Sequence, residues 1–83
     1  MNVTIIGGAG RMGRWLTHYF VNQGHKVTIS DTRFNEAADL ANSSGAEFVK
    51  ENTEAVLEAD LTVVSTPIPT IPQVLREIFN RLK

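Results

Sequence analysis

The sequence has 83 residues, of which 42% are hydrophobic and 20% are charged, with a net charge of −1 and no cysteine. These values are ordinary for one small globular domain and give no reason to expect disorder, a membrane-spanning helix or a nucleic-acid partner. The lack of cysteine excludes disulfides and thiolate metal sites. Strand pattern begins directly after Met1 with no secretory leader, and we therefore expect a cytoplasmic protein.

The first part of the chain predicts a strand, a helix and a second strand. The strand covers Asn2–Ile6, the helix runs from about Arg11 to Gln23, and Gly24 ends it before an alternating strand at Val27–Ser30. Apolar residues with helical spacing predict one buried stripe on this helix, formed by Met12, Trp15, Leu16, Tyr19 and Phe20.

The second part predicts shorter elements. A helix rich in small residues is expected from Phe34 to Ser43, followed by a short strand at Ala46–Val49. A short helix at Thr53–Glu58, capped by Asn52 or Thr53, then leads to an apolar fourth strand at Leu61–Ser65.

The last predicted element is a helix that follows a stiff loop containing two prolines. Thr70 is expected to cap this helix and Gln73 to complete a capping box, with Arg81 and Lys83 near its carboxyl end.

Strands and helices therefore alternate four times, which predicts the α/β class. We expect a Rossmann-like, doubly wound parallel sheet with four strands in the order 3-2-1-4 and right-handed crossovers. Residues 1–83 then form one domain. A complete domain of this type has a second half with further strands, so the expected fold is truncated.

The turn after the first strand carries a glycine fingerprint made of Gly8, Ala9, Gly10, Arg11, Met12 and Gly13. A strand before it and a helix after it are the context in which this fingerprint binds the pyrophosphate of a dinucleotide. Gly8 is expected to make the tight turn, Gly10 to let backbone amides approach the pyrophosphate, and Gly13 to let the helix pack closely. Arg11 is a candidate phosphate contact. The alternative is that the glycines only make a tight connection.

An acidic residue, Asp31, closes the second strand eighteen positions after Gly13. A carboxylate there accepts hydrogen bonds from a ribose 2′-hydroxyl and repels a 2′-phosphate, which favours NAD as the cofactor. Thr32 and Arg33 could instead hold the 2′-phosphate of NADP. A helix cap is the alternative role for Asp31.

Ser65, Thr66 and Pro67 follow the fourth strand, at the point of the sheet where ligands bind in open α/β folds. We expect their polar groups to face the nicotinamide end of the cofactor, and an ordinary rigid turn is the alternative. His18 and His25 are expected at the surface, and no catalytic residue or metal site is predicted.

The runs Ile5–Trp15 and Val64–Ile68 resemble the N-terminal part of prephenate dehydrogenases, particularly the archaeal form. The resemblance covers essentially the whole chain. It implies oxidative decarboxylation of prephenate to 4-hydroxyphenylpyruvate in tyrosine biosynthesis, with a nicotinamide dinucleotide as hydride acceptor. It also implies that Ser65 and Thr66 lie near the substrate.

The catalytic histidine, the substrate-binding arginines and the dimerisation domain of that family lie beyond the matched segment. We therefore expect the 83-residue chain to have no appreciable activity alone, with prephenate a ligand of the longer parent protein. Alternatives are a fragment of a 3-hydroxyacid or 6-phosphogluconate dehydrogenase, a non-catalytic NAD-sensing module, and an interaction protein that has lost the nucleotide. A bare outer edge on the fourth strand would favour a homodimer.

Overall fold

A parallel sheet forms the centre of the protein, seen here in a computed structural model that describes residues 1–81. Its strands are β1 (Asn2–Ile6), β2 (Lys26–Ser30), β3 (Glu47–Phe48) and β4 (Leu61–Val64). They are arranged in the order β3-β2-β1-β4, and every neighbouring pair is parallel. The predicted fold class and strand order are therefore confirmed.

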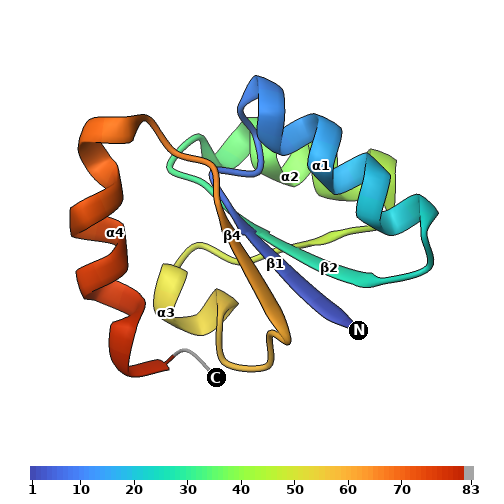
Figure 1. The fold of residues 1–83 in the computed structure, drawn as a ribbon. Coiled ribbons are helices and arrows are strands. Elements are labelled where there is room, and N and C mark those ends of the chain that lie inside the picture. Colours follow the sequence, from blue (N-terminus) through green and yellow to red (C-terminus); the bar gives the residue numbers. More distant parts are fainter. Residues whose placement is uncertain (82–83) are drawn as a thin grey trace.

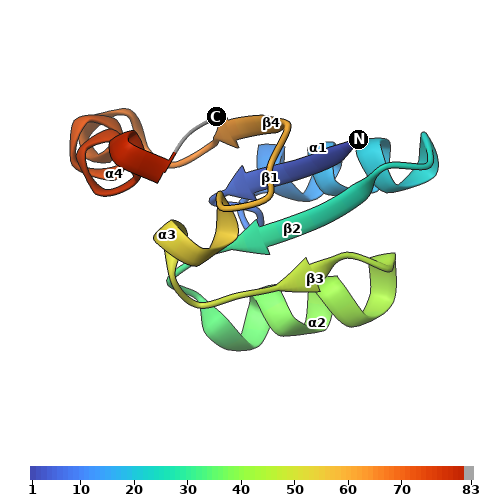
Figure 2. The same ribbon diagram turned by 90° about the horizontal axis from the view of Figure 1, so that it is seen from below.

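Helices cover both faces of this sheet (Figures 1 and 2). One face carries α1 (Arg11–Asn22) and α2 (Phe34–Ser44), and the other carries α3 (Asn52–Ala55) and α4 (Ile71–Ile78). Two short 3-10 segments, Ile68–Thr70 and Phe79–Arg81, flank α4. None of the helices described for residues 1–81 has the length and apolar character needed to cross a bilayer.

The predicted element boundaries given above differ from the observed ones by at most one residue, except in the crossover between β3 and β4. There the helix was expected at Thr53–Glu58, but α3 begins at Asn52 and ends at Ala55. The following backbone turns to bring Asp60 beside β1, where the amide of Asp60 donates to the carbonyl of Asn2 at 2.8 Å. The helix ends early because the chain has to reach the sheet again by Asp60.

The register brings the carboxyl ends of three strands to the same edge of the sheet. Ile6 of β1 lies beside Ser30 of β2 on one side and Val64 of β4 on the other. Because parallel strands point the same way, the loops after these strands meet above that edge. This arrangement brings together segments that are far apart in the sequence.

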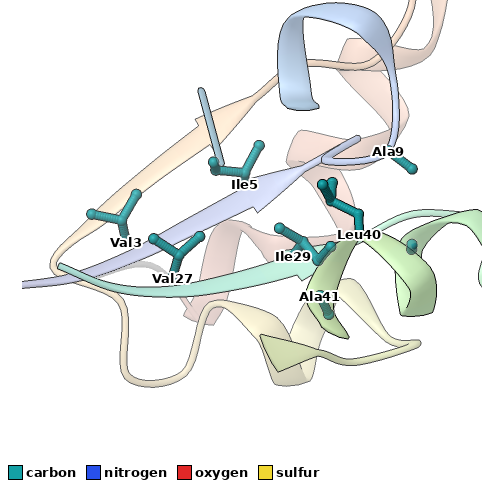
Figure 3. Packing of buried hydrophobic residues seen from close by; sticks show 8 residues of the cluster. Val3, Ile5, Ala9, Val27, Ile29, Leu40 and Ala41 are labelled. Atoms are coloured by element: carbon teal, nitrogen blue, oxygen red, sulfur yellow. The ribbon is translucent and has the colours of Figure 1, made fainter. Parts of the chain in front are cut away.

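Two apolar clusters hold the layers together. Between the sheet and the α1–α2 layer, buried side chains from β1, β2 and α2 interlock, as Figure 3 shows for Ile5, Ile29 and Leu40. On the opposite face Ile6 packs with Val56, Val74 and Ile78, which attaches α4 to the sheet. Burial of these branched side chains is the main driving force that fixes the helices on the sheet.

The predicted buried stripe on α1 is wrong for three of its five members. The exposed fractions are 61% for Met12, 61% for Trp15 and 46% for Tyr19, with the rings of Trp15 and Tyr19 stacked on the surface. Small residues, Gly13 and Thr17, face the sheet instead. The helix turns this face inward because small side chains let its backbone pack closely on the strands. This close packing takes precedence over burial of the apolar stripe.

Trp15 is the single tryptophan of the sequence and offers a direct test of this surface. We expect its emission in the folded chain to be red-shifted and nearly as accessible to acrylamide as in the urea-unfolded chain, because most of the side chain is exposed. Stern–Volmer quenching measures this accessibility. A blue-shifted, protected emission at low protein concentration would contradict the observed rotation of α1.

Two predicted helix caps, and the cap considered as the alternative role of Asp31, do not form. The Thr70 hydroxyl precedes α4 but donates to the carbonyl of Pro67 at 2.6 Å, and no side-chain cap is present there. Neither Asn52 nor Thr53 caps α3, whose N-cap residue is Glu51. Asp31 does not cap α2, because that helix starts after Arg33 without a side-chain cap. Lys83, expected at the end of the last helix, lies outside the described residues.

Candidate functional site

A cleft of about 440 Å³ opens at the carboxyl edge of the sheet, between the loops that follow β1, β2 and β4 and the inner side of α4. Six predicted site residues line it, namely Asp31, Thr32, Arg33, Ser65, Thr66 and Pro67. The glycine turn is represented in the lining by Gly7 rather than by Gly8–Gly13. The volume falls in the range of pockets for small molecules and cofactors.

The glycine turn has its sharpest backbone conformation at Gly7, one residue earlier than predicted. Gly7 has a φ of +86°, whereas Gly8 does not adopt a positive φ. A Cβ atom on Gly8 would lie 2.7 Å from the side chain of Ile29, so Gly8 is required for contact with β2. The tight turn expected of Gly8 is therefore made by Gly7, because the left-handed conformation strongly favours glycine.

Gly13 does have the packing role predicted for it. A Cβ atom there would overlap the carbonyl oxygen of Gly7 and lie 2.7 Å from Cα of Gly8. The first turn of α1 thus rests directly on the turn that leaves β1. This contact fixes the amino end of the helix against the turn.

The amides of the turn divide into two groups. Those of Gly8, Ala9 and Gly10 are used inside the protein, since they donate to Ser30 O, Asp31 Oδ2 and Gly7 O at 3.4, 3.0 and 3.2 Å. The first helical bond of α1 runs from the amide of Arg14 to the carbonyl of Gly10, at 2.8 Å.

The three amides before Arg14, at residues 11–13, precede this bond, and Gly10 provides no side-chain cap. An anion would therefore meet the amino end of α1, where the helix dipole also favours negative charge. The amide of Gly10 itself holds the turn in shape, and the prediction that Gly10 lets backbone amides approach the pyrophosphate stays a prediction.

Asp31 lies at the junction between the turn and the cleft. Its Oδ2 accepts from the amide of Ala9 at 3.0 Å, and its Oδ1 accepts from the amide of Arg33 at 2.9 Å. The guanidinium of Arg33 donates to both oxygens, from Nε to Oδ1 and from Nη2 to Oδ2, each at 3.0 Å. The carboxylate thus ties β2 to the glycine turn, with its side chain only 4% exposed.

These contacts set the ionisation of both partners. Burial by itself would raise the pKa of Asp31, but the hydrogen bonds from the Arg33 side chain, the Arg33 amide and the Ala9 amide hold the pKa below its ordinary value. The hydrogen bond to Asp31 raises the pKa of Arg33 above its ordinary value. Both groups are therefore charged at neutral pH and form a stable ion pair.

A second chain of polar side chains lines the cleft, and no local pattern predicted it. Ser30 donates from its hydroxyl to Oδ1 of Asn52 at 2.5 Å, and Nδ2 of Asn52 donates to Glu77 at 3.0 Å. Asn52 was expected only as a helix cap. Its amide instead joins β2 to α4, and both Asn52 and Glu77 line the cleft.

The loop after β4 forms the facing wall. The amide of Ser65 donates to the carbonyl of Ile6 at 2.7 Å, which fixes the loop against β1. Oγ1 of Thr66 is buried and has no hydrogen-bond partner among residues 1–81. Buried hydroxyls are normally bonded, so this atom is a candidate ligand contact.

These features fit a nicotinamide dinucleotide, which supplies hydride transfer when bound. The open amino end of α1 and the side chain of Arg11 can hold the pyrophosphate. Thr32 and Arg33 can contact the adenosine side, and the Thr66 hydroxyl can contact the nicotinamide side. Asp31 lines the same cleft as Ser65–Pro67, so one ligand group can contact both loops. Contact of the cofactor with each of these residues remains a prediction.

Comparison with known proteins agrees with this chemistry. A family profile described as "NADP oxidoreductase coenzyme F420-dependent" matches residues 2–83. The chain belongs to this family. It is an NAD(P)-binding, Rossmann-like domain of the kind found in oxidoreductases.

One curated relative and several solved structures are similar to this member of the family. A probable arogenate/prephenate dehydrogenase of Methanocaldococcus jannaschii is 28% identical over all 83 residues, which are 19% of that protein. The 3-hydroxyisobutyrate dehydrogenase of Mycobacterium tuberculosis matches 99% of this chain with a TM-score of 0.89 and 24% identity, and this likeness shows the fold alone.

An imine reductase variant from Myxococcus stipitatus, solved in complex with NAD+, matches 93% of this chain with a TM-score of 0.81 and 30% identity. This chain covers 28% of the hydroxyisobutyrate dehydrogenase and 27% of the imine reductase. It thus spans about a fifth of the length of its curated relative and just over a quarter of these two structures.

Proposed function

We propose that this chain is the dinucleotide-binding portion of a dehydrogenase that acts on prephenate or arogenate. The observation that carries the proposal is the cleft at the carboxyl edge of the sheet, which Gly7 of the turn before α1 lines together with Asp31 and Ser65–Pro67. Sequence identity of 28% to a probable arogenate/prephenate dehydrogenase, over the full length of this chain, supports this substrate class.

In this proposal the chain binds and orients the cofactor, and Ser65 and Thr66 lie near the substrate. Oxidative decarboxylation of prephenate needs an acceptor for its 4-hydroxyl group and cations for two carboxylates. The cleft-lining residues include one cation, Arg33, which is already paired with Asp31. We therefore expect no appreciable turnover of prephenate by the 83-residue chain. Turnover is measured by the absorbance of the reduced cofactor.

The second candidate is the corresponding portion of a 3-hydroxyacid dehydrogenase or a related reductase. It is favoured by the 30% identity to the imine reductase. A non-catalytic NAD-sensing module would use the same cleft without any substrate. The three candidates share dinucleotide binding and differ in what they bind next to it.

Titration followed by nuclear magnetic resonance separates these candidates. The labelled chain is first saturated with NAD or NADP and then titrated with prephenate or with 3-hydroxyisobutyrate. We expect the cofactor to shift the amide signals of residues 11–13, and prephenate then to shift those of Ser65 and Thr66, with Gly24 at the opposite end of α1 as the unaffected control.

Each outcome of the titration bears on a different candidate function. Shifts caused by 3-hydroxyisobutyrate and not by prephenate would favour the second candidate. Shifts by neither substrate would contradict the placement of Ser65 and Thr66 near the substrate. Failure of both cofactors to bind would contradict the dinucleotide function itself and leave the glycines with a purely structural role.

Self-association is also part of the proposal. In the described sheet β4 has one unpaired edge, and the exposed side chains of Trp15 and Tyr19 lie on the neighbouring helical layer. We expect sedimentation velocity to show a fraction of dimer that increases with protein concentration. A monomeric mass at every concentration would contradict this expectation. The cytoplasmic location favoured by the sequence stays a prediction.

A further inference from the structure

We propose that Glu77, on the inner side of α4, accepts a hydrogen bond from the exocyclic amino group of the cofactor's base, and that the site thereby selects a 6-amino purine over a 6-oxo purine. The inference rests on the proposed dinucleotide function and deepens it by assigning the residue that sets base specificity. Asn52 is the positioning residue that holds Glu77 for this contact. No sequence pattern marks either residue as a ligand contact.

The α4 side of the cleft combines an apolar wall with a row of polar side chains. Val74 packs with Ile6 of β1, and both residues line the cleft. Thr70, Gln73 and Glu77 line the same side, from the start of α4 to its last turn. A flat aromatic base suits such a surface, because its faces are apolar and its edge carries hydrogen-bonding groups.

Two hydrogen bonds fix the orientation of the Glu77 carboxylate. The Ser30 hydroxyl donates to Oδ1 of Asn52, and Nδ2 of Asn52 donates to Oε2 of Glu77 at 3.0 Å. Reversing the Asn52 amide would set its oxygen against the carboxylate, so the order of donors and acceptors along this chain is fixed. Oε1 of Glu77 makes no hydrogen bond within residues 1–81. Glu77 therefore presents an acceptor, and not a donor, to a ligand in the cleft.

This acceptor lies close to the place where the ribose of the nucleotide is expected. Ser30 directly precedes Asp31 at the end of β2, and only the side chain of Asn52 separates Ser30 from Glu77. Asp31 and Glu77 line the same cavity of about 440 Å³. A base joined to a ribose at Asp31 would therefore enter the side of the cleft where Glu77 presents its oxygen.

The edge of the purine decides the selection. At position 6 adenine carries an amino group, which donates a hydrogen bond, whereas guanine and hypoxanthine carry an oxygen, which accepts one. A carboxylate has no proton to give to that oxygen. A 6-oxo base would therefore lose the contact and would also set its oxygen against Oε1 of Glu77.

Gln73 lies one turn before Glu77 and can contact the neighbouring ring nitrogen of the base. The capping box expected of Gln73 does not form, because the amide of Thr70 donates to the carbonyl of Pro67 at 2.9 Å. The Gln73 amide can turn either its oxygen or its nitrogen toward the cleft, so it suits both kinds of purine. Discrimination between them thus depends on Glu77.

Calorimetric titration of the 83-residue chain with NAD+ and with nicotinamide hypoxanthine dinucleotide tests the assignment. The corresponding 2′-phosphorylated pair serves if the chain prefers NADP+. We expect the adenine form to bind about tenfold or more tightly, the factor for one charge-assisted hydrogen bond. Glu77→Gln keeps an oxygen for Asn52 and turns an amino group to the ligand, which should bring the ratio to about one or below. The matched control is Glu54→Gln, the same change at an exposed residue of α3 outside the cleft, which should keep the ratio.

Nicotinamide guanine dinucleotide gives a second measurement that needs no variant and stands even if Glu77→Gln folds poorly. As another 6-oxo ligand, it should bind about as weakly as the hypoxanthine form. Equal binding of the adenine and 6-oxo forms would overturn the assignment. A preference for adenine that Glu77→Gln leaves unchanged would also overturn it, because a residue with a purely structural role weakens both forms alike. If no dinucleotide binds, the proposed function itself fails, a result distinct from equal binding of the two bases.

Discussion

Replacing Gly13 by alanine is expected to lower the free energy of unfolding by about 3 kcal/mol or more, enough to unfold much of a small domain. The added Cβ would overlap the carbonyl oxygen of Gly7 and lie 2.7 and 2.8 Å from the Cα and carbonyl carbon of Gly8. All three are backbone atoms and cannot rotate away. The first turn of α1 must therefore lift from β1, and urea denaturation followed by circular dichroism measures the loss.

Gly24→Ala is the matched control for this substitution. Gly24 has a φ of +86°, and an added Cβ there meets nothing within 4 Å. Its replacement carries only the strain of a left-handed conformation, about 1 kcal/mol. A loss in Gly13→Ala no larger than the loss in Gly24→Ala would contradict the close contact between α1 and the turn after β1.

Replacing Asp31 by alanine is expected to lower the free energy of unfolding at neutral pH by about 2 kcal/mol, because the Ala9 amide and the Arg33 guanidinium then lose their acceptor. The exposed carboxylate of Asp39 on α2 provides the control, since Asp39→Ala should change stability by less than about 0.5 kcal/mol. Urea denaturation of the three proteins at neutral pH measures both values.

The contribution of Asp31 should also depend on pH in a defined direction. Its pKa is lower in the folded protein than the ordinary value of 3.8, so the folded state binds the proton more weakly than the unfolded chain. The stabilisation is therefore complete above pH 3.8 and is lost as the pH falls from there through the folded pKa. Repeating the denaturation across this window should show the gap between the parent chain and Asp31→Ala closing. A gap that stays constant would contradict the ion pair.

The elements that could be predicted from the sequence are those specified by local patterns. Alternating and continuous apolar runs marked β1, β2 and β4, and the glycine turn followed by a helix marked the βαβ unit. Chain order and the right-handed crossover then left few arrangements of the sheet, which is why the order β3-β2-β1-β4 was predicted. Position along the strands also placed Asp31 and Ser65 at one edge.

The contacts within the site could not be predicted in the same way. Periodicity assigned Trp15 and Tyr19 to the core, but the close approach of Gly13 and Thr17 to the sheet rotated the helix and exposed both rings. The role of Asn52 depends on β2 and α4, which are distant in sequence, so no local pattern could reveal its link to Glu77.

The sequence by itself determined the α/β fold, the glycine turn and the presence of both a carboxylate and a guanidinium at the end of β2. Only the tertiary structure decided how those two groups are used. Asp31 and Arg33 are two residues apart, but the amide of Ala9, which Asp31 also binds, comes from the turn after another strand. The capacity of a carboxylate to accept further hydrogen bonds depends on the assembled site, because a lone pair that already accepts from one donor does not accept from another.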